Sequence, residues 1–344
     1  IGTLIGPILN SSTGEYFCTI QEAIDAAATV SGNTILIPAG TWAEDVTVNK
    51  GVILEGPNQG TSGCDPARSD EAIIEGYVKI TTSNVTNDGL SFLDGGNVPA
   101  GELSSVYISG GLDNIMIANS TFFRSGTVDL DGSRGIINEI GGVTNLNISY
   151  NAFTGYHTGV YLQTASATVF ENCIDGNQVG ISSDSPVDVS INNNDITNNL
   201  FEGVGIGGTI TDMDIQYNNI VGNNNGIQNY SPGLVDGILN WYGDASGPSG
   251  DGPGTGDSVL GNVLFCPWLT TEYNGSPTPM TNAAVQNMNT GRYFCSIQDA
   301  IDFSTTLDGH TIKILGSSHL EPNQVHVTKS VEITGDGPLN TTLQ

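Results

Sequence analysis

The chain has 344 residues, of which 36 are acidic and only 8 are lysine or arginine, so its formal net charge at pH 7 is −28. This charge argues against nucleic acids and anionic lipid headgroups as partners, because a strongly acidic surface repels them. No apolar run is long enough to insert into a membrane, and 46 glycines with 38% hydrophobic residues favour a thin solenoid over a thick layered fold. The chain begins without a basic and apolar leader, so we expect a mature or excised form.

The opening segment predicts a short helix over residues 19–30. Thr19 and Glu22 have the spacing of a capping box. Four apolar side chains follow at helical spacing and form one face: Ile20, Ala23, Ile24 and Ala27. The first turn of a solenoid exposes its core, so we expect this amphipathic helix to be a cap.

Between residues 105 and 245 a shorter repeat predicts stacked turns of a parallel β-helix. Four asparagines recur at steps of 21, 22 and 24 residues, and a glycine followed by valine or isoleucine comes eight or nine residues after each: Asn151, Asn172, Asn194 and Asn218. Asparagine tolerates left-handed backbone angles, and its amide can bond to an identical amide in the next turn. We therefore predict an asparagine ladder at a bend, with Ser120 in the equivalent place of a degenerate first turn.

The unit closes over residues 240–269. The glycine- and proline-rich stretch after Asp244 cannot sustain a helix or a central strand, so we expect an extended loop there. Trp241 and Trp268 flank this loop and are predicted to cover the last turn.

The opening segment recurs near the end of the chain. Residues 13–25, TGEYFCTIQEAID, return as residues 290–302, TGRYFCSIQDAID, and matching apolar strands follow each copy. We therefore divide the chain into one complete unit, 1–269, a linker, 270–289, and the start of a second, truncated copy, 290–344. Neighbouring units of the same polypeptide are the expected partners.

Five scattered cysteines without a CxxC motif argue against a zinc site and favour disulfides in an extracellular protein. Cys266 and Cys295 lie close together at the domain junction, so we pair them first. Cys18 is then expected to bridge to Cys64, or alternatively to face an upstream copy. Cys173 stands beside Ile174 in a repeat and is predicted to be a small buried apolar residue.

These segments resemble the pectin-lyase-like superfamily of parallel β-helix proteins. The opening helix with TILIPAGTW (34–42) and VTVNKGVILEG (46–56) is similar to its N-terminal cap and first turns, and the Asn/Gly turns are similar to its generic and NosD-like repeats. The ending NWYGDASGPSG…FCPWL is similar to closing segments in large secreted bacterial surface proteins. The resemblance implies an all-β, right-handed parallel β-helix solenoid at the cell surface or outside the cell. It implies little about activity, because this fold carries lyases, hydrolases, esterases, adhesins and spacers.

Catalytic candidates lie around residues 124–161. The Arg-x-Pro-x-x-Arg and Trp-x-Asp-His motifs of pectate lyases and the paired-aspartate signatures of polygalacturonases are missing. Arg124 and Arg134 are the basic side chains that a uronate lyase would need in the central turns, with Lys79 upstream. His157 is a candidate proton shuttle, and Tyr156 and Tyr161 beside it are candidates for stacking on a sugar ring.

Calcium is the candidate cofactor. Asp129 and Asp131 alternate and so share one face of a strand, where they would serve as an acid–base pair or as Ca²⁺ ligands with Glu139, which is also a candidate ligand-binding residue. No lysine or arginine occurs between Arg134 and Arg292, so an anionic glycan would meet an acidic surface there unless Ca²⁺ intervenes.

Three functions fit these observations. The first is a non-enzymatic structural or adhesive repeat module of a large extracellular protein. The second is a carbohydrate-active enzyme, a Ca²⁺-dependent polysaccharide lyase or a glycoside hydrolase, with its site on the groove over residues 124–161. The third is glycan binding without turnover, in which a polysaccharide is the partner.

Overall fold

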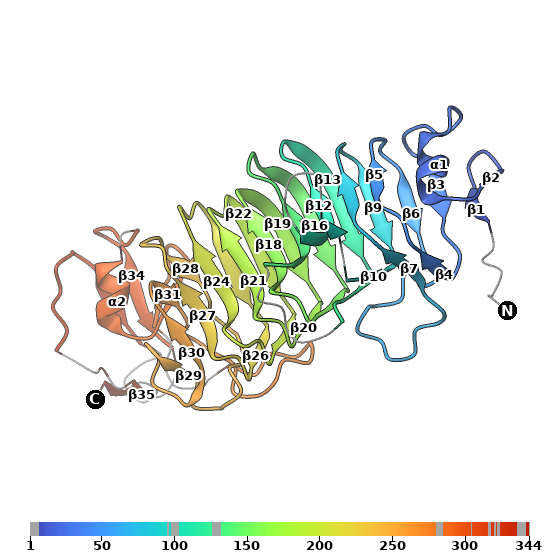
Figure 1. Ribbon diagram of the computed structural model, residues 1–344. Coiled ribbons are helices and arrows are strands. Elements are labelled where there is room, and N and C mark those ends of the chain that lie inside the picture. Colours follow the sequence, from blue (N-terminus) through green and yellow to red (C-terminus); the bar gives the residue numbers. More distant parts are fainter. Residues whose placement is uncertain are drawn as a thin grey trace.

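The chain winds into a long coil in which each turn from β3 (Thr34–Leu36) to β27 (Asn225–Asn229) adds one parallel strand to each of three sheets (Figure 1). The computed structural model describes residues 7–94, 96–97, 103–125, 132–279, 285–303, 305–315, 318–319, 321, 324–335 and 342–343. Successive strands pass from sheet A to sheet B to sheet C and pair in parallel with those of the next turn. In nearly all proteins, a crossover between two parallel strands of one sheet is right-handed. The predicted right-handed parallel β-helix is therefore confirmed.

The strands of the three sheets are short, and in each sheet they follow one another from the N-terminal cap toward the closing end of the coil. Sheet A contains β2 (Glu15–Phe17), β1 (Ile8–Asn10), β3 (Thr34–Leu36), β6 (Ile53–Glu55), β9 (Val85–Asp88), β13 (Leu112–Ala118), β16 (Val143–Ser149), β19 (Ala165–Phe170), β22 (Asp188–Asn192), β25 (Met213–Gln216), β28 (Val235–Asp236) and β31 (Val263–Leu264). Sheet B contains β4 (Gly40–Trp42), β7 (Ala72–Glu75), β10 (Ser91–Leu93), β14 (Thr121–Phe123), β17 (Ala152–Thr154), β20 (Cys173–Asp175), β23 (Asp195–Thr197) and β26 (Asn219–Val221). Sheet C contains β5 (Val46–Val48), β8 (Val78–Ile80), β12 (Leu103–Ile108), β15 (Arg134–Asn138), β18 (Thr158–Gln163), β21 (Val179–Asp184), β24 (Glu202–Gly207), β27 (Asn225–Asn229), β30 (Gly256–Leu260) and β29 (Pro248–Gly250), with β11 (Gly96–Asn97) antiparallel to β12.

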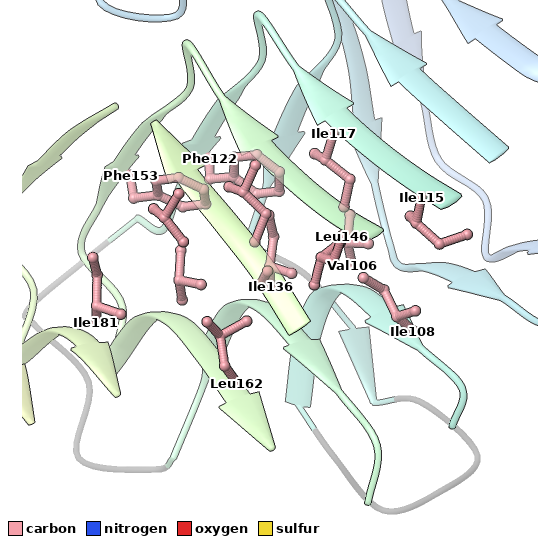
Figure 2. Packing of buried hydrophobic residues seen from close by; sticks show 14 of the residues in the cluster. Val106, Ile108, Ile115, Ile117, Phe122, Ile136, Leu146, Phe153, Leu162 and Ile181 are labelled. Carbon is pink, nitrogen blue, oxygen red and sulfur yellow. The ribbon is translucent and has the colours of Figure 1, made fainter. Parts of the chain in front are cut away.

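The core is a narrow column in which like side chains stack from turn to turn. The rings of Phe92, Phe122 and Phe153 come from neighbouring strands of sheet B, with centroids 4.6 and 4.5 Å apart. Figure 2 shows Phe122 and Phe153 facing the isoleucines and leucines of sheets A and C. Burying each ring contributes about 1.5–3 kcal/mol. In each of these strands the central phenylalanine points into the core, because successive side chains of a strand point to opposite faces.

Glycine is the second residue in four successive strands of sheet C, β15, β18, β21 and β24. A Cβ on Gly135, Gly159, Gly180 or Gly203 would lie 2.6–2.8 Å from the carbonyl oxygen of the equivalent glycine in the next turn. None of the four has a φ in the left-handed region. Close approach between turns, and not a tight bend, is therefore what requires glycine at these positions.

Helix α1 (Ile20–Asp25) covers the N-terminal end of the core, but it is shorter than predicted. Ile20, Ala23 and Ile24 are buried, whereas Ala27 is exposed and lies outside the helix. The Thr19 hydroxyl caps the helix by accepting from the Glu22 N–H at 3.1 Å, as predicted. The helix ends early because the chain turns extended at Ala26, and the Thr29 hydroxyl takes over the Ala23 carbonyl at 2.6 Å.

The second copy repeats the first cap strand by strand. It contains β32 (Val285–Asn287), β33 (Tyr293–Phe294), α2 (Ile297–Asp302), β34 (Thr311–Ile314) and β36 (Glu332–Thr334), followed by the pair β35 (Ser318–His319) and β37 (Thr342–Leu343). The buried bond from Asn10 to Thr29 has its equivalent from Asn287 to Thr306. Strand β32 matches β1, so the repeated structure begins five residues earlier than the repeated sequence.

The C-terminal end of the first unit is covered partly as predicted. Trp268 is buried in the core, and its indole N–H donates to the Ala245 carbonyl at 3.2 Å. Trp241 is only half-buried, and Tyr242 fills the last turn instead, with its hydroxyl donating to the Gly237 carbonyl at 3.0 Å. The glycine- and proline-rich stretch also forms β29, an edge strand where a proline is tolerated. Neither described helix could cross a bilayer.

Candidate functional site

Aromatic side chains gather on the outer face of sheet C, in the region where the sequence placed a site. Tyr77, Tyr107 and Ile137 form a buried cluster outside the main core, and Tyr161 packs against it. Tyr107, Ile137 and Tyr161 stand opposite one another on β12, β15 and β18. We call these four residues the sheet C cluster. Burial raises the pKa of Tyr77, and the nearby Asp45 carboxylate raises it further.

Two of the predicted basic residues lie over rings of this cluster. The Lys79 Nζ is 5.4 Å from the centroid of the Tyr107 ring, and the Arg134 Cζ is 4.9 Å from that of Tyr161. Such cation–π contacts hold a positive charge against an apolar surface. Arg134 and Tyr161, predicted separately as site residues, are therefore brought together.

His157 lies on the same turn as Tyr161, next to the turn that contains Arg134. Arg134 pairs with Thr158 in the ladder between β15 and β18, which places His157 one residue from the strand partner of Arg134. Its ring Nδ1 lies 3.1 Å from the Thr158 hydroxyl, and its backbone N–H donates to the Ser133 hydroxyl at 3.2 Å. A guanidinium offers donors and no acceptor, so Arg134 suits the binding of a carboxylate or sugar better than proton abstraction.

Arg124 directly follows β14, at the start of the segment that connects sheet B to β15. Its Nη1 donates to the Asp94 carbonyl, and the neighbouring Ser125 hydroxyl donates to the Asp94 carboxylate at 2.8 Å. Asp94 itself has a left-handed backbone, with φ 63°. Arg124 thus supports the bend after sheet B through Asp94.

Tyr156 is fully buried, which corrects its predicted role as a sugar-stacking residue. Its hydroxyl lies 2.8 Å from that of Ser105 inside the coil, and its backbone N–H donates to the Asn177 Oδ1 at 3.1 Å. Burial raises the pKa of the Tyr156 hydroxyl. The side chain is therefore a polar element of the core.

The predicted calcium ligands do not form a described site. Asp129 and Asp131 lie outside the described residues. Glu139 is exposed at the far end of β15 from Arg134, where its carboxylate accepts from the Gly110 N–H at 3.4 Å. In the described part of the chain, no three histidine, cysteine, aspartate or glutamate side chains converge as metal ligands. Calcium binding stays a prediction.

The asparagine ladder lies at the bend between sheets A and B and has the predicted bonds. The side-chain amide of each member donates to the Oδ1 of the next at 2.9–3.1 Å: Asn151, Asn172, Asn194, Asn218 and finally Asn240. The left-handed backbone belongs to the residue before each asparagine, such as Glu171 and Asn193, and not to the ladder asparagine. Ser120 takes the place of asparagine one turn earlier, and its N–H donates to Asn151 at 3.0 Å.

A second ladder at the bend between sheets B and C was missed. Asn177 donates to Asn199 and Asn199 to Asn223, at 3.2 and 2.8 Å, and Asn223 donates to the Asp257 carboxylate at 2.9 Å. The spacings of 22 and 24 residues matched the first ladder and could have revealed it. The repeat in the sequence spans only three asparagines, because Tyr156 stands at the equivalent position one turn earlier and Asp257 one turn later.

The disulfides differ from the expected set. Cys266 is bonded to Cys295, as predicted, but Cys64 is bonded to Cys173, and Cys18 is an exposed free thiol. Cys18 lies at the N-terminal cap. The loop before β7 instead carries Cys64 along the coil to turns formed by much later residues. There the Gly63 N–H donates to the Tyr150 carbonyl at 2.6 Å. Cys173 points away from the core while Ile174 points into it, so its predicted role as a buried apolar residue is also wrong.

No family model matches the chain. A cell surface glycoprotein of Methanothermus fervidus is 31% identical over 90 residues, which span 26% of this chain and 14% of that protein. Two solved structures from Azotobacter vinelandii align over 94% of both chains: the A-modules of the mannuronan C-5 epimerases AlgE4, at 16% identity and a TM-score of 0.38, and AlgE6, at 12% and 0.36. The fold assignment rests on the strand ladders of the chain itself.

Proposed function

We propose that the chain is a structural repeat module of a large protein exposed at the cell surface, in which coiled units are joined end to end. The observation that carries this proposal is the junction between the two copies. The cap of the second copy packs against Leu264 at the closing end of the first unit, and the Cys266–Cys295 disulfide bonds the two. A solenoid whose end is covered by the next cap can be extended by further copies.

Two further observations support this role. Buried amide ladders on two of its edges satisfy their own donors and acceptors along the coil, which favours a stiff rod. The partial relative is named a cell surface glycoprotein. An acidic exterior that repels other acidic molecules suits a crowded surface.

A glycan-binding or carbohydrate-active surface is the second candidate, and the sheet C cluster is the observation that favours it. Arg134 over the Tyr161 ring, with His157 nearby, combines a cation, an aromatic face and an imidazole on neighbouring turns. Aromatic faces suit the apolar faces of sugars, and a guanidinium suits a carboxylate.

Surface location is tested with an antibody raised against the full chain. We expect it to label intact cells of the source organism, and we expect brief protease treatment of those cells to remove the signal. Labelling that appears only after permeabilisation would contradict the proposal.

The enzyme alternative is tested by incubating the full chain with a panel of neutral and uronate polysaccharides, with and without Ca²⁺. We expect no new reducing ends and no unsaturated-sugar absorbance. Depolymerisation that is lost in Arg134→Ala but kept in Arg68→Ala would move the assignment to an enzyme on sheet C. Binding on a glycan array without turnover, lost in the same variant, would identify an adhesive surface.

A further inference from the structure

The junction between the two copies shows how one unit meets the next. Phe294 is completely buried there, and Cys295 is bonded to Cys266 with their Cα atoms 5.1 Å apart. Phe265, Cys266, Phe294, Cys295 and Phe303 line a hollow between the closing segment and α2. The contact therefore combines apolar packing around α2 with one covalent bond.

In the first cap, no described residue covers the equivalent surface. The caps have the same backbone, since the residues before α1 and α2, Thr19 and Ser296, have φ of −134° and −135° and both have ψ of 157°. Tyr16 is 66% exposed, whereas its equivalent Tyr293 is half-buried. Phe17 is only partly buried where Phe294 is fully buried, and Cys18 is a free thiol where Cys295 is bonded.

We infer that the face formed by Tyr16, Phe17 and Cys18 docks the closing segment of another unit of this type, and that a disulfide from Cys18 locks the contact. The inference rests on the proposed end-to-end function and names the partner of the N-terminal face. The partner surface is the equivalent of residues 263–268, in which a cysteine follows an apolar strand.

Bond formation requires an oxidant of the small-molecule disulfide class. The Cys18 thiolate attacks that disulfide, forms a mixed disulfide and releases one thiol. The partner cysteine, as its thiolate, then attacks Cys18 Sγ and displaces the second thiol. Two protein thiols are oxidised to one disulfide and the oxidant is reduced to two thiols, so atoms and electrons balance.

Charge at the junction limits which unit fits. Burial raises the pKa of Asp214 and of Asp236, and the Arg292 guanidinium from the second copy offsets part of both rises. Arg292 also lies over the Phe303 ring, 4.9 Å from its centroid. The first cap has Glu15 in place of Arg292 and Ala26 in place of Phe303. A partner that presents two aspartates would therefore repel Glu15, and the matching unit carries a neutral or basic residue at one of these two positions or at both.

A tandem chain tests the inference. Residues 1–284 are repeated ahead of residues 8–344, so that Ile8 takes the place of Val285 at the new junction. The added copy carries Cys18→Ser, which leaves a single Cys18 in the chain. It also carries Asp214→Asn and Asp236→Asn, to match Glu15, and a second version keeps both aspartates. Each protein is refolded in a glutathione redox buffer, alkylated without reduction and mapped by mass spectrometry.

We expect Cys18 bonded to the added copy's Cys266 in nearly all molecules of the Asn version, and a several-fold lower bridged fraction when the aspartates are kept. A Cys18 that stays alkylated in the Asn version, while Cys266–Cys295 forms in the same molecules, overturns the inference and leaves the proposed function standing. Absence of both bonds contradicts the end-to-end function itself. Equal bridging in the two versions overturns the charge requirement.

Discussion

The hydroxyl groups of Tyr156 and Ser105 lie 2.8 Å apart in the core, although 51 residues separate them in the chain. Tyr156 follows Gly155, whose left-handed backbone turns the chain from sheet B toward sheet C. At the same bend in the later turns, the equivalent residues are the buried asparagines of the second ladder. The tyrosine thus replaces a ladder member and reaches along the coil to a partner on sheet C two turns earlier.

We predict that Tyr156→Phe lowers the free energy of unfolding by about 1–3 kcal/mol, because it leaves the buried Ser105 hydroxyl without this partner. The double variant with Ser105→Ala should recover most of the loss, because both polar groups are then removed. Urea unfolding followed by circular dichroism measures the cycle. Tyr161→Phe is the control, since the Tyr161 side chain is only partly buried, and we expect a change below about 0.5 kcal/mol. Additive losses in the double variant would contradict the pairing.

We predict a larger loss for Asn194→Ala in the middle of the first ladder. The Asn194 amide donates to Asn218 and to the Val169 carbonyl, both at 2.9 Å, and its Oδ1 accepts from Asn172. Each buried group left unsatisfied costs about 1–3 kcal/mol, so we expect a total of about 3 kcal/mol or more. Asn224→Ala, at an exposed bend residue, should change stability by less than about 0.5 kcal/mol. Similar effects of the two substitutions would show that the ladder adds no stability.

We predict that non-reducing peptide mapping of the oxidised chain finds Cys64 joined to Cys173 and one alkylated cysteine, Cys18. The bond closes 109 residues of chain, so Cys64→Ser with Cys173→Ser should lower stability, by up to about 4–5 kcal/mol on the loop-entropy estimate. Thermal unfolding measures the loss, with Cys18→Ser as a control that leaves both bonds intact. A peptide that joins Cys18 to Cys64 would contradict the structure.

We predict that stability rises as the pH falls from neutral toward the usual carboxyl range, in part through Asp236. Burial raises the pKa of Asp236 in the folded chain above its ordinary value of 3.8. The folded state therefore binds the proton more tightly than the unfolded state, and the stabilisation is fully present below pH 3.8 and lost as the pH rises through the raised value. Melting temperatures between pH 4 and pH 8 should fall less steeply in Asp236→Asn than in the original chain. Equal slopes would show that Asp236 does not contribute.

The regular part of the fold could be predicted because each turn repeats the same local requirement. Asn151 and its successors satisfy one another directly, so their spacing in the sequence is the spacing of the turns. The cap helix was predicted for the same reason, since the Thr19 cap and the apolar face of Ile20, Ala23 and Ile24 are local features. Its end was not, because it depends on Thr29 and Asn10, which meet only in the folded cap.

Features that depend on contacts between distant turns could not be predicted. The Cys64–Cys173 bond depends on the path of the loop before β7, and nothing near either cysteine indicates that path. Tyr156 was predicted to be an exposed ligand because its burial follows from the orientation of one bend residue. Arg134 and Tyr161 were named separately, and only the folded chain places the guanidinium over the ring.

The Cys266–Cys295 bond has a mechanical consequence for a chain under tension. The cysteines are 29 residues apart, a segment that would span about 100 Å if fully extended. While the bond is intact, a pulling force passes through the sulfur atoms and this contour length cannot be drawn out. Reduction would remove this restraint at every such junction of an array, so under tension the array could lengthen by drawing out this segment, together with β32 and β33 of the cap, before the turns of the preceding coil unfold.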